Sequence, residues 1–345
     1  MKRLALFACV LCAVCVASVL APFALNAQEQ PPATAESGFD ESGLDAVSGT
    51  PLAPLVRASR PTPDTVIRTD DGGTTMEIYF RALPQGSSGI VRVFGENAAG
   101  SPVESVTAAF LDDALAFYPA SVTGLDDSFY AIASAGMEQN ARPGYDFTAL
   151  IRYADGSEAT LIQPLDVVVG PFIRQIVTLP PDTAFLLDAE TERNELARLE
   201  SIHGAYTPER FWDADGFQLP IRNELTSPFG AFRTFNDSVN TRHTGWDIRT
   251  TMGIPVMASE AGRVAFAGRL SIRGSHVIVD HGYGVFSGYS HLSQIHVTTG
   301  QTLTKGQIIG MTGATGRTSG PHFHWEMAVN GDYVDSVQFL EMWMP

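Results

Sequence analysis

The chain has 345 residues, of which 44% are hydrophobic and 17% charged, a composition typical of a soluble protein with more than one domain. Its formal net charge is −16; the acidic excess lies before Gln218, whereas acidic and basic residues balance from Gln218 onward. This distribution argues against nucleic acid as a partner, because nucleic-acid-binding domains carry basic surfaces.

The first residues predict an export signal. Lys2 and Arg3 precede an apolar run that ends near Ala27 in a sequence suited to cleavage, which predicts a signal peptide over residues 1–27. An uncleaved segment would instead anchor the chain in a membrane. In both cases we expect an exported protein of the periplasm, the cell envelope or the extracellular space. The mature chain would then contain no disulfides, because all three cysteines lie in the apolar run: Cys9, Cys12 and Cys15.

Residues 28–63 and residues 64–175 differ in pattern. The first segment is rich in proline, small residues and acids without periodicity, which predicts a disordered linker. In the second, apolar and polar residues alternate, as in Met76–Ala82 and Tyr145–Tyr153, and Asp155-Gly156 offers a hairpin turn. We therefore predict an immunoglobulin-like β-sandwich over residues 64–175, whose role as a spacer or an accessory binding module is open.

Residues 176–217 are predicted to be a helical connector. Asp188 can cap a helix that Gly204 can end, and the apolar residues between them form a narrow stripe of Leu196, Leu199 and Ile202. A rigid connector is one interpretation. The alternative is that this segment covers the functional groove of the domain that follows, so latency is open.

Residues 218–345 are rich in glycine and predict short strands, together with three groups of polar residues that can carry chemistry. Arg242-His243-Thr244-Gly245-Trp246-Asp247 offers an imidazole and a carboxylate, and His291 ends an aromatic-rich strand. His322 and His324 alternate in a strand and therefore share one face. Each group alone could be structural. The predicted strands are Arg263–Ala267, His276–Asp280, Val285–Tyr289, Gln307–Met311 and Pro321–Ala328.

Together these groups supply three potential ligands and two further imidazoles, which suits a hydrolytic zinc site. Three protein ligands leave a fourth position for water, whose pKa the metal can lower to about 7. A neighbouring neutral imidazole can accept the proton of that water and return it to a leaving amine.

The three motifs resemble the signature of the lysostaphin-type zinc endopeptidases, which cut peptidoglycan peptides. They read His243-x-Gly245-x-Asp247, Tyr289-x-His291-Leu292-Ser293 and Thr315-Gly316-x-x-x-Gly320-Pro321-His322-x-His324-x-Glu326. Supporting similarities are Ser227-Pro228-Phe229-Gly230, Arg233, Asn236, Gly253-Ile254-Pro255-Val256 and Asp280-His281-Gly282.

The resemblance covers residues 218–345 and implies an antiparallel β metallopeptidase domain of the duplicated hybrid motif, so the whole chain is expected to be mostly β. It implies that His243, Asp247 and His324 bind Zn²⁺ and that His291 and His322 are catalytic. The expected substrate is peptidoglycan, cut in its peptide stems or cross-bridges. Relatives often carry a tyrosine shortly before the first ligand, and residues 234–242 contain none.

Several alternatives are open. A non-catalytic relative would activate a cell-wall amidase, although such relatives usually lack ligands that this chain keeps; a general extracellular peptidase is a third possibility. Glu326 lies on the same face of the predicted strand as His322 and His324. Its carboxylate could orient a metal ligand, or it could have no role in catalysis. His281 could support the site, whereas structural or solvated roles are expected for His203, His276 and His296. The scissile bond and the oligomeric state are open.

Overall fold

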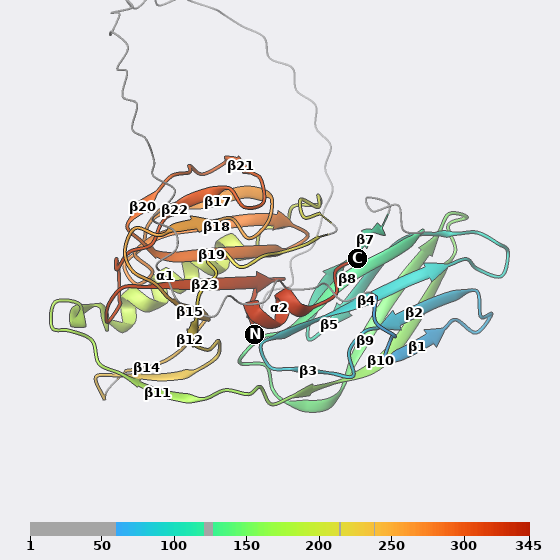
Figure 1. Cartoon of the computed structure of the whole chain (residues 1–345). Coiled ribbons are helices and arrows are strands. Elements are labelled where there is room, and N and C mark those ends of the chain that lie inside the picture. The colour runs from blue at the N-terminus through green and yellow to red at the C-terminus, as the bar shows by residue number, and fades with distance from the viewer. Residues whose placement is uncertain (1–59, 121–126, 214, 238) are drawn as a thin grey trace, which may run out of the picture. The chain divides into compact units, whose positions relative to one another are not determined.

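The computed structural model describes residues 60–120, 127–213, 215–237 and 239–345 (Figure 1). Most of the regular structure in these residues is strand, and the predicted mostly β fold class is confirmed. The predicted signal peptide and most of the predicted linker, residues 28–59, lie outside the described residues. Across the described ranges, no helix has both the length and the apolar character needed to cross a membrane.

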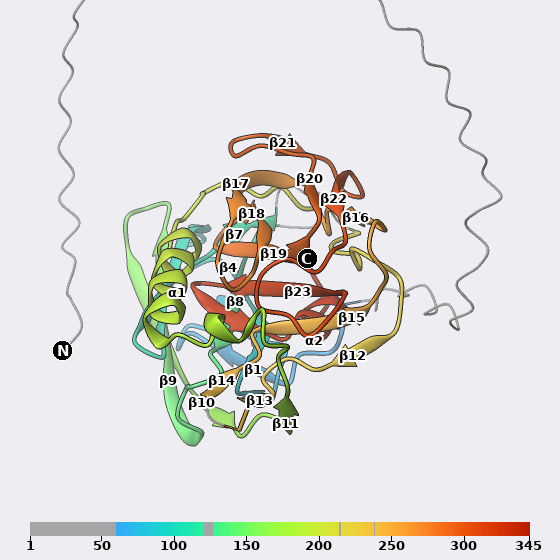
Figure 2. The ribbon, with the colours of Figure 1, turned by 90° about the vertical axis from the view of Figure 1, so that its left-hand side faces the viewer.

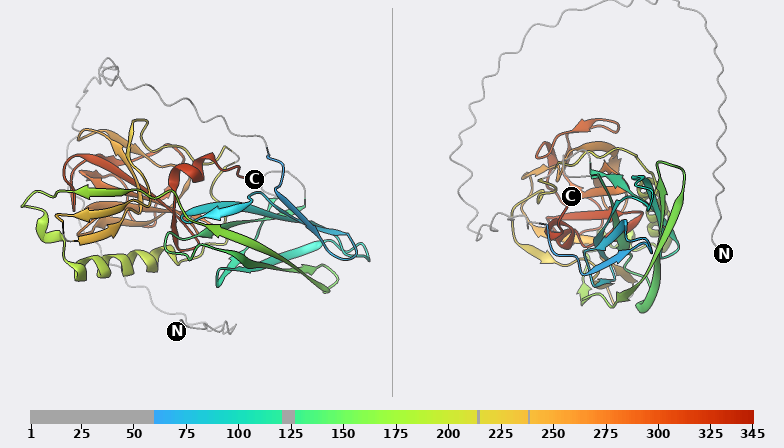
Figure 3. Two further views of the ribbon diagram at one scale, coloured as in Figure 1. Left: turned by 90° about the horizontal axis from the view of Figure 1, so that it is seen from below. Right: turned by 90° about the vertical axis from the view of Figure 1, so that its right-hand side faces the viewer.

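Residues 65–168 form two five-stranded sheets that share one apolar core. Met76 and Ile78 from one sheet and Phe147 and Ile151 from the other are fully buried in it, as the alternating pattern predicts. The two sheets therefore form a β-sandwich (Figure 3), and its immunoglobulin type stays a prediction. The strand order of the first sheet is β1 (Thr65–Arg68), β2 (Thr74–Ile78), β4 (Ser87–Gly95), β8 (Ser128–Ala135) and β7 (Tyr118–Pro119). The strand order of the second sheet is β3 (Ala82–Pro84), β10 (Glu158–Val168), β9 (Arg142–Tyr153), β5 (Val103–Phe110) and β6 (Asp113–Ala116).

The segment after the sandwich contributes one strand and one helix to the C-terminal part. Strand β11 (Arg174–Val177) pairs in parallel with β13 (Phe232–Phe235), so this strand crosses the predicted boundary at residue 175. The predicted helix is confirmed as α1 (Ala189–His203). Asp188 accepts the backbone N–H of Thr191 at its start, and Gly204 ends it.

The C-terminal part is built around an antiparallel sheet with the order β12-β15-β23-β19-β18-β17-β21, and β24 pairs with β23 (Figure 1). All five predicted strands are present in this part. The sheet consists of β12 (Leu225–Ser227), β15 (Gly245–Arg249), β23 (His322–Val329), β19 (Val285–Leu292), β18 (Ser275–Gly282), β17 (Gly262–Arg269), β21 (Thr302–Leu303) and β24 (Asp332–Val334). Two smaller sheets complete this part. One has the order β11, β13 and β14 (Val239–Arg242), and the other has the order β16 (Pro255–Met257), β22 (Ile308–Met311) and β20 (Gln294–Ile295). The 3-10 helix η3 (Ala184–Leu186) precedes α1, and the helix α2 (Ser336–Glu341) follows β24.

Helix α1 lies against one face of this large sheet (Figure 2). Leu199 of α1 packs with Phe286 and Ala328, which belong to β19 and β23. Side chains two residues apart in a strand share a face. The strand β23 therefore runs from beneath α1, at Ala328, towards His324 on the same face.

Burial of neutral histidines predicts acid sensitivity of the fold. His203, in the last turn of α1, packs against Phe286 and Tyr333, and its Nδ1 has no hydrogen-bond partner. Burial lowers the pKa of His203 to about 4, with Glu326 opposing and Arg273 reinforcing the shift. The unfolded imidazole takes a proton below about pH 6.5, so the folded state loses stability as the pH falls from 6.5 towards 4.

We expect the substitution His203→Phe to remove the loss of unfolding free energy that His203 causes at acidic pH. This loss is on the order of 3 kcal/mol, because each unit of pKa shift corresponds to about 1.4 kcal/mol. The measurement is the free energy of unfolding in denaturant between pH 7 and pH 4.5. His296→Gln, at an exposed histidine, should leave the slope unchanged. An unchanged slope in His203→Phe would contradict the prediction.

Candidate active site

Strand pairing brings the three predicted ligands together. In the register of β15 and β23, Asp247 lies opposite His324, and His243 lies two residues before the start of β15. One ligand atom from each of the three residues lies within 4.8 Å of the other two. All three side chains are buried, with 3 to 7% of their surface exposed.

The hydrogen bonds of the two imidazoles show which nitrogens face the cluster. His243 Nδ1 donates to the carbonyl oxygen of Pro228 at 2.7 Å, and His324 Nε2 donates to Glu326 Oε1 at 3.1 Å. His243 Nε2 and His324 Nδ1 are the ring nitrogens that face Asp247 Oδ1, at 3.0 and 2.9 Å, and they lie 2.9 Å from each other. Two ring nitrogens and one carboxylate oxygen thus converge on one point. A divalent cation that accepts nitrogen and oxygen ligands, such as Zn²⁺, fits this arrangement.

Arg233 orients the carboxylate of the cluster. Its guanidinium donates to Asp247 Oδ2, which leaves Oδ1 to face the two imidazoles. Arg233 also donates to Ser227 Oγ at 2.8 Å and to Gln175 Oε1 of β11 at 3.3 Å. Burial opposes ionisation, but the interactions with His243 and with the Arg233 guanidinium hold the pKa of Asp247 well below its usual range. Burial lowers the pKa of His243 to about 4.

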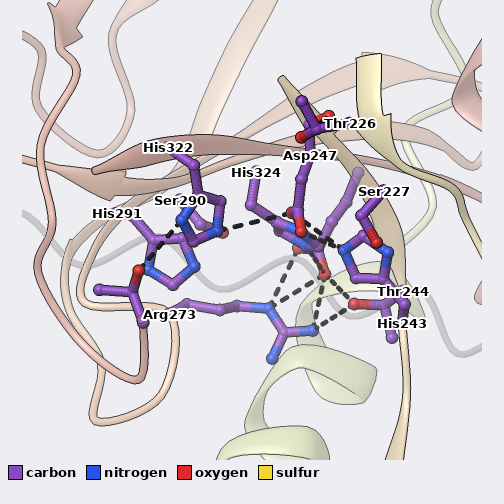
Figure 4. Close-up of polar contacts among 12 residues, drawn as sticks. Thr226, Ser227, His243, Thr244, Asp247, Arg273, Ser290, His291, His322 and His324 are labelled. Atoms are coloured by element: carbon purple, nitrogen blue, oxygen red, sulfur yellow. Dashed lines mark hydrogen bonds and ion pairs between the residues drawn. The ribbon is translucent and has the colours of Figure 1, made fainter. Parts of the chain in front are cut away.

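The two predicted catalytic histidines lie beside the cluster, with their ring centres 4.6 Å apart (Figure 4). His291 Nδ1 donates to the carbonyl oxygen of Thr315 at 2.7 Å, and His322 Nδ1 lies 3.0 Å from the carbonyl oxygen of Gly320. These contacts leave Nε2 of each ring as the nitrogen that can exchange a proton. His322 Nε2 lies 3.6 Å from Asp247 Oδ1. The glycine-rich turn therefore holds both rings through its backbone carbonyls.

The backbone of His291 adopts an unusual conformation. Its φ is +60°, in the left-handed region that residues with a Cβ seldom occupy. The N–H of His291 donates to the carbonyl oxygen of Arg273 at 2.9 Å, which helps to hold this conformation. Strained backbone of this kind is common at functional sites. Its conformation was not part of the sequence prediction.

Two cavities meet at this site. One, of about 490 Å³, is lined by α1 residues such as Leu196 and by His243 and His324; the other, of about 460 Å³, is lined by β11 and by His322. Both share a wall formed by Arg233, Phe235, His291 and Arg317. An extended chain that passed from one cavity to the other would cross the candidate ligands.

The remaining histidines lie outside the cluster. His281 bonds to the carbonyl oxygen of Ala261 and to Ser287 Oγ, both at 2.7 Å, and therefore contacts no predicted site residue through these bonds. His276 Nδ1 lies 3.0 Å from Ser290 Oγ and the ring is buried, whereas His296 is exposed. His203, in the last turn of α1, is buried, as described above.

Two residues near the ligands were missed by the sequence predictions. Arg273, between β17 and β18, donates to both carboxylate oxygens of Glu326. Glu195 of α1 accepts from the backbone of the same loop. One signal was present: Glu195 stands four residues before Leu199, so a charged residue lies on the apolar side of the helix.

Comparisons with known proteins agree with the motifs. The model of peptidase family M23 matches residues 241–336. The DD-carboxypeptidase/endopeptidase Mpg of Neisseria meningitidis is 38% identical over 125 residues, 35% of this chain and 29% of that protein. The peptidoglycan DD-endopeptidase ShyA of Vibrio cholerae is 38% identical over 96 residues, 28% of this chain and 22% of that protein.

One solved structure shares the fold over most of the chain. This structure, a "putative peptidase M23" from Pseudomonas aeruginosa, has a TM-score of 0.54 and 23% identity, and the match covers 76% of this chain and 96% of that one. The chain spans less than a third of the length of the two sequence relatives.

Proposed function

We propose that this chain, whose residues 241–336 match the model of peptidase family M23, is a zinc-dependent endopeptidase that hydrolyses peptide stems or cross-bridges of bacterial peptidoglycan. The observation that carries the proposal is the convergence of His243 Nε2, Asp247 Oδ1 and His324 Nδ1, three atoms of buried side chains that are all of the types that bind zinc. The names of the relatives, which include a peptidoglycan DD-endopeptidase, support the substrate class.

His243, Asp247 and His324 would hold the zinc ion. Zinc with three protein ligands acidifies a water in its open position and polarises a carbonyl group. The protein's share of the chemistry falls to His291 and His322, whose Nδ1 atoms bond to backbone carbonyls. One Nε2 would accept the proton of the attacking water and return it to the leaving amine, while the other, protonated, would donate to the oxyanion.

Arg233 would hold the site in its geometry, because its ion pair fixes the Asp247 carboxylate that faces both proposed ligand histidines. The cavities on either side of the cluster would take the peptide before and after the scissile bond. An exported location follows from the predicted signal peptide and from the proposed substrate.

The test is hydrolysis of purified muropeptides by the full chain, followed by mass analysis of the products. We expect release of peptides by the zinc-loaded protein, loss of that activity after a chelator and its return on addition of Zn²⁺. Mass analysis would also identify the bond that is cut. Muropeptides left intact by folded, zinc-loaded protein would contradict the proposed activity.

A further inference from the structure

Glu326 connects a candidate zinc ligand to a buried arginine. Its Oε1 accepts from His324 Nε2 at 3.1 Å, on the side of the ring opposite the cluster. Arg273 donates to the same carboxylate through Nη2 at 2.7 Å and through Nε at 3.1 and 3.2 Å. Glu326 is 2% exposed and Arg273 6%, so water does not compete for these bonds. The bonds set the direction of the carboxylate, and the carboxylate sets the direction of the ring.

Glu195 of α1 holds Arg273 in turn. Its carboxylate accepts the backbone N–H groups of Ile272 at 2.7 Å and of Arg273 at 3.0 Å. It also lies 3.4 Å from Nη1 of Arg273 and is 6% exposed. Both ends of the Arg273 residue, backbone and guanidinium, are therefore fixed by one side chain from the helix. The Arg273 loop and its contacts with the site are drawn next to a helix in Figure 4.

The same loop also holds a predicted catalytic residue. The carbonyl oxygen of Arg273 accepts the N–H of His291, the residue with a φ of +60°. Movement of the loop would thus disturb both the ligand His324, through Glu326, and the backbone of His291.

The charges of Glu195, Arg273 and Glu326 favour a cation near this group. Two buried carboxylates, Glu195 and Glu326, flank one guanidinium, so they carry one negative charge more than Arg273 neutralises, and the ring of His324 is the next partner of Glu326. Buried charge is costly unless it is paired. A metal ion bound through His324 would lie on the far side of the ring that Glu326 contacts.

From these contacts we propose that Glu195 is a positioning residue for the zinc site, acting through Arg273 and Glu326 on His324. The proposal rests on the proposed zinc-binding function of His243, Asp247 and His324. Helix α1 lies outside the residues matched by the family model, 241–336, so a segment from before the peptidase domain completes the site. Loss of the Glu195 carboxylate releases the loop while all three ligands remain.

The experiment measures Zn²⁺ affinity of the full chain by competition with a chromophoric chelator. We expect Glu195→Gln to weaken binding about 10-fold, the lower end of the range known for residues that orient a ligand, and Glu326→Gln to weaken it at least as much. If the residues act in series, the double variant should bind no more weakly than Glu326→Gln alone. Glu190→Gln, which removes an exposed carboxylate from the first turn of α1, is the matched control and should bind like wild type.

Two further measurements separate positioning from a purely structural role. The absorption spectrum of the Co²⁺-substituted protein should change in Glu195→Gln, because a released His324 alters the geometry around the metal. Thermal unfolding of the zinc-free proteins reports the stability of the fold itself. Should Glu195→Gln not fold, Glu195→Asp keeps the charge but shortens its reach, and the same loss of zinc affinity is expected.

The outcomes are distinct. A Glu195→Gln protein with wild-type zinc affinity overturns the inference, whether or not the zinc-free fold is destabilised, and leaves the proposed function intact. Additive effects of Glu195→Gln and Glu326→Gln also overturn it. A wild-type chain that binds no zinc overturns the proposed function and this inference together.

Discussion

Replacement of His291 by alanine is expected to reduce the turnover of muropeptides by about 10²- to 10⁴-fold, the usual contribution of a general acid or base. The imidazole lies beside the cluster, and its Nδ1 is bonded to Thr315, so Nε2 is the nitrogen that the variant removes from the reaction. Zinc affinity should stay close to that of wild type, because the three proposed ligands and Glu326 are unchanged. The measurements are kcat on a purified muropeptide and zinc affinity on the same preparation.

Because the backbone of His291 is left-handed, a second variant is needed to separate catalysis from stability. Alanine at a φ of +60° costs roughly 1 kcal/mol, whereas asparagine adopts this region more readily. We therefore expect His291→Asn to be as inactive as His291→Ala but closer to wild type in thermal stability. His296→Ala, at an exposed histidine of the same part of the chain, should keep full activity. Substantial turnover by folded His291→Asn would rule out a catalytic role for the imidazole.

The residues that carry local signals were predictable. The helix α1 was expected from Asp188 and Gly204, because capping preferences act over only a few residues, and both ends are confirmed. The five strands of residues 218–345 were expected from alternating apolar and polar residues and from residue types that favour strands. The grouping of His243, Asp247 and His324 was predicted through the resemblance of the motifs, and the register of β15 and β23 brings them together. Their roles stay predictions.

The contacts made across long sequence separations were not predictable. Glu195 and Arg273 are 78 residues apart, and nothing near either residue indicates its partner. The pairing of β11 with β13 is similar, because a short edge strand takes its place from the sheet it joins. The left-handed backbone of His291 is likewise set by its contacts with Arg273 and Thr315. Packing decides these features, so single-sequence patterns do not contain them.

The glycine between the first two candidate ligands gives the second prediction of large effect. Gly245 lies in β15 opposite Glu326 of β23. A Cβ built on Gly245 would lie 2.2 Å from the carbonyl oxygen of Trp325 and 2.8 Å from its carbonyl carbon, both backbone atoms. Because β23 also pairs with β19, its backbone has no room to move away. The substitution Gly245→Ala must therefore push β15 away from β23.

We expect Gly245→Ala to lower the free energy of unfolding by about 2 kcal/mol, a typical cost of overpacking, and to weaken zinc binding more than 10-fold. Both effects have one origin, since Asp247 and His324 face each other across the same pair of strands two residues further along. Denaturant unfolding of the zinc-free protein and competition for Zn²⁺ measure them separately. Gly320→Ala is the matched control for stability, because a Cβ there meets no atom within 4 Å. A Gly245→Ala protein as stable as Gly320→Ala, with wild-type zinc affinity, would show that the separation of β15 and β23 does not determine the geometry of the ligands.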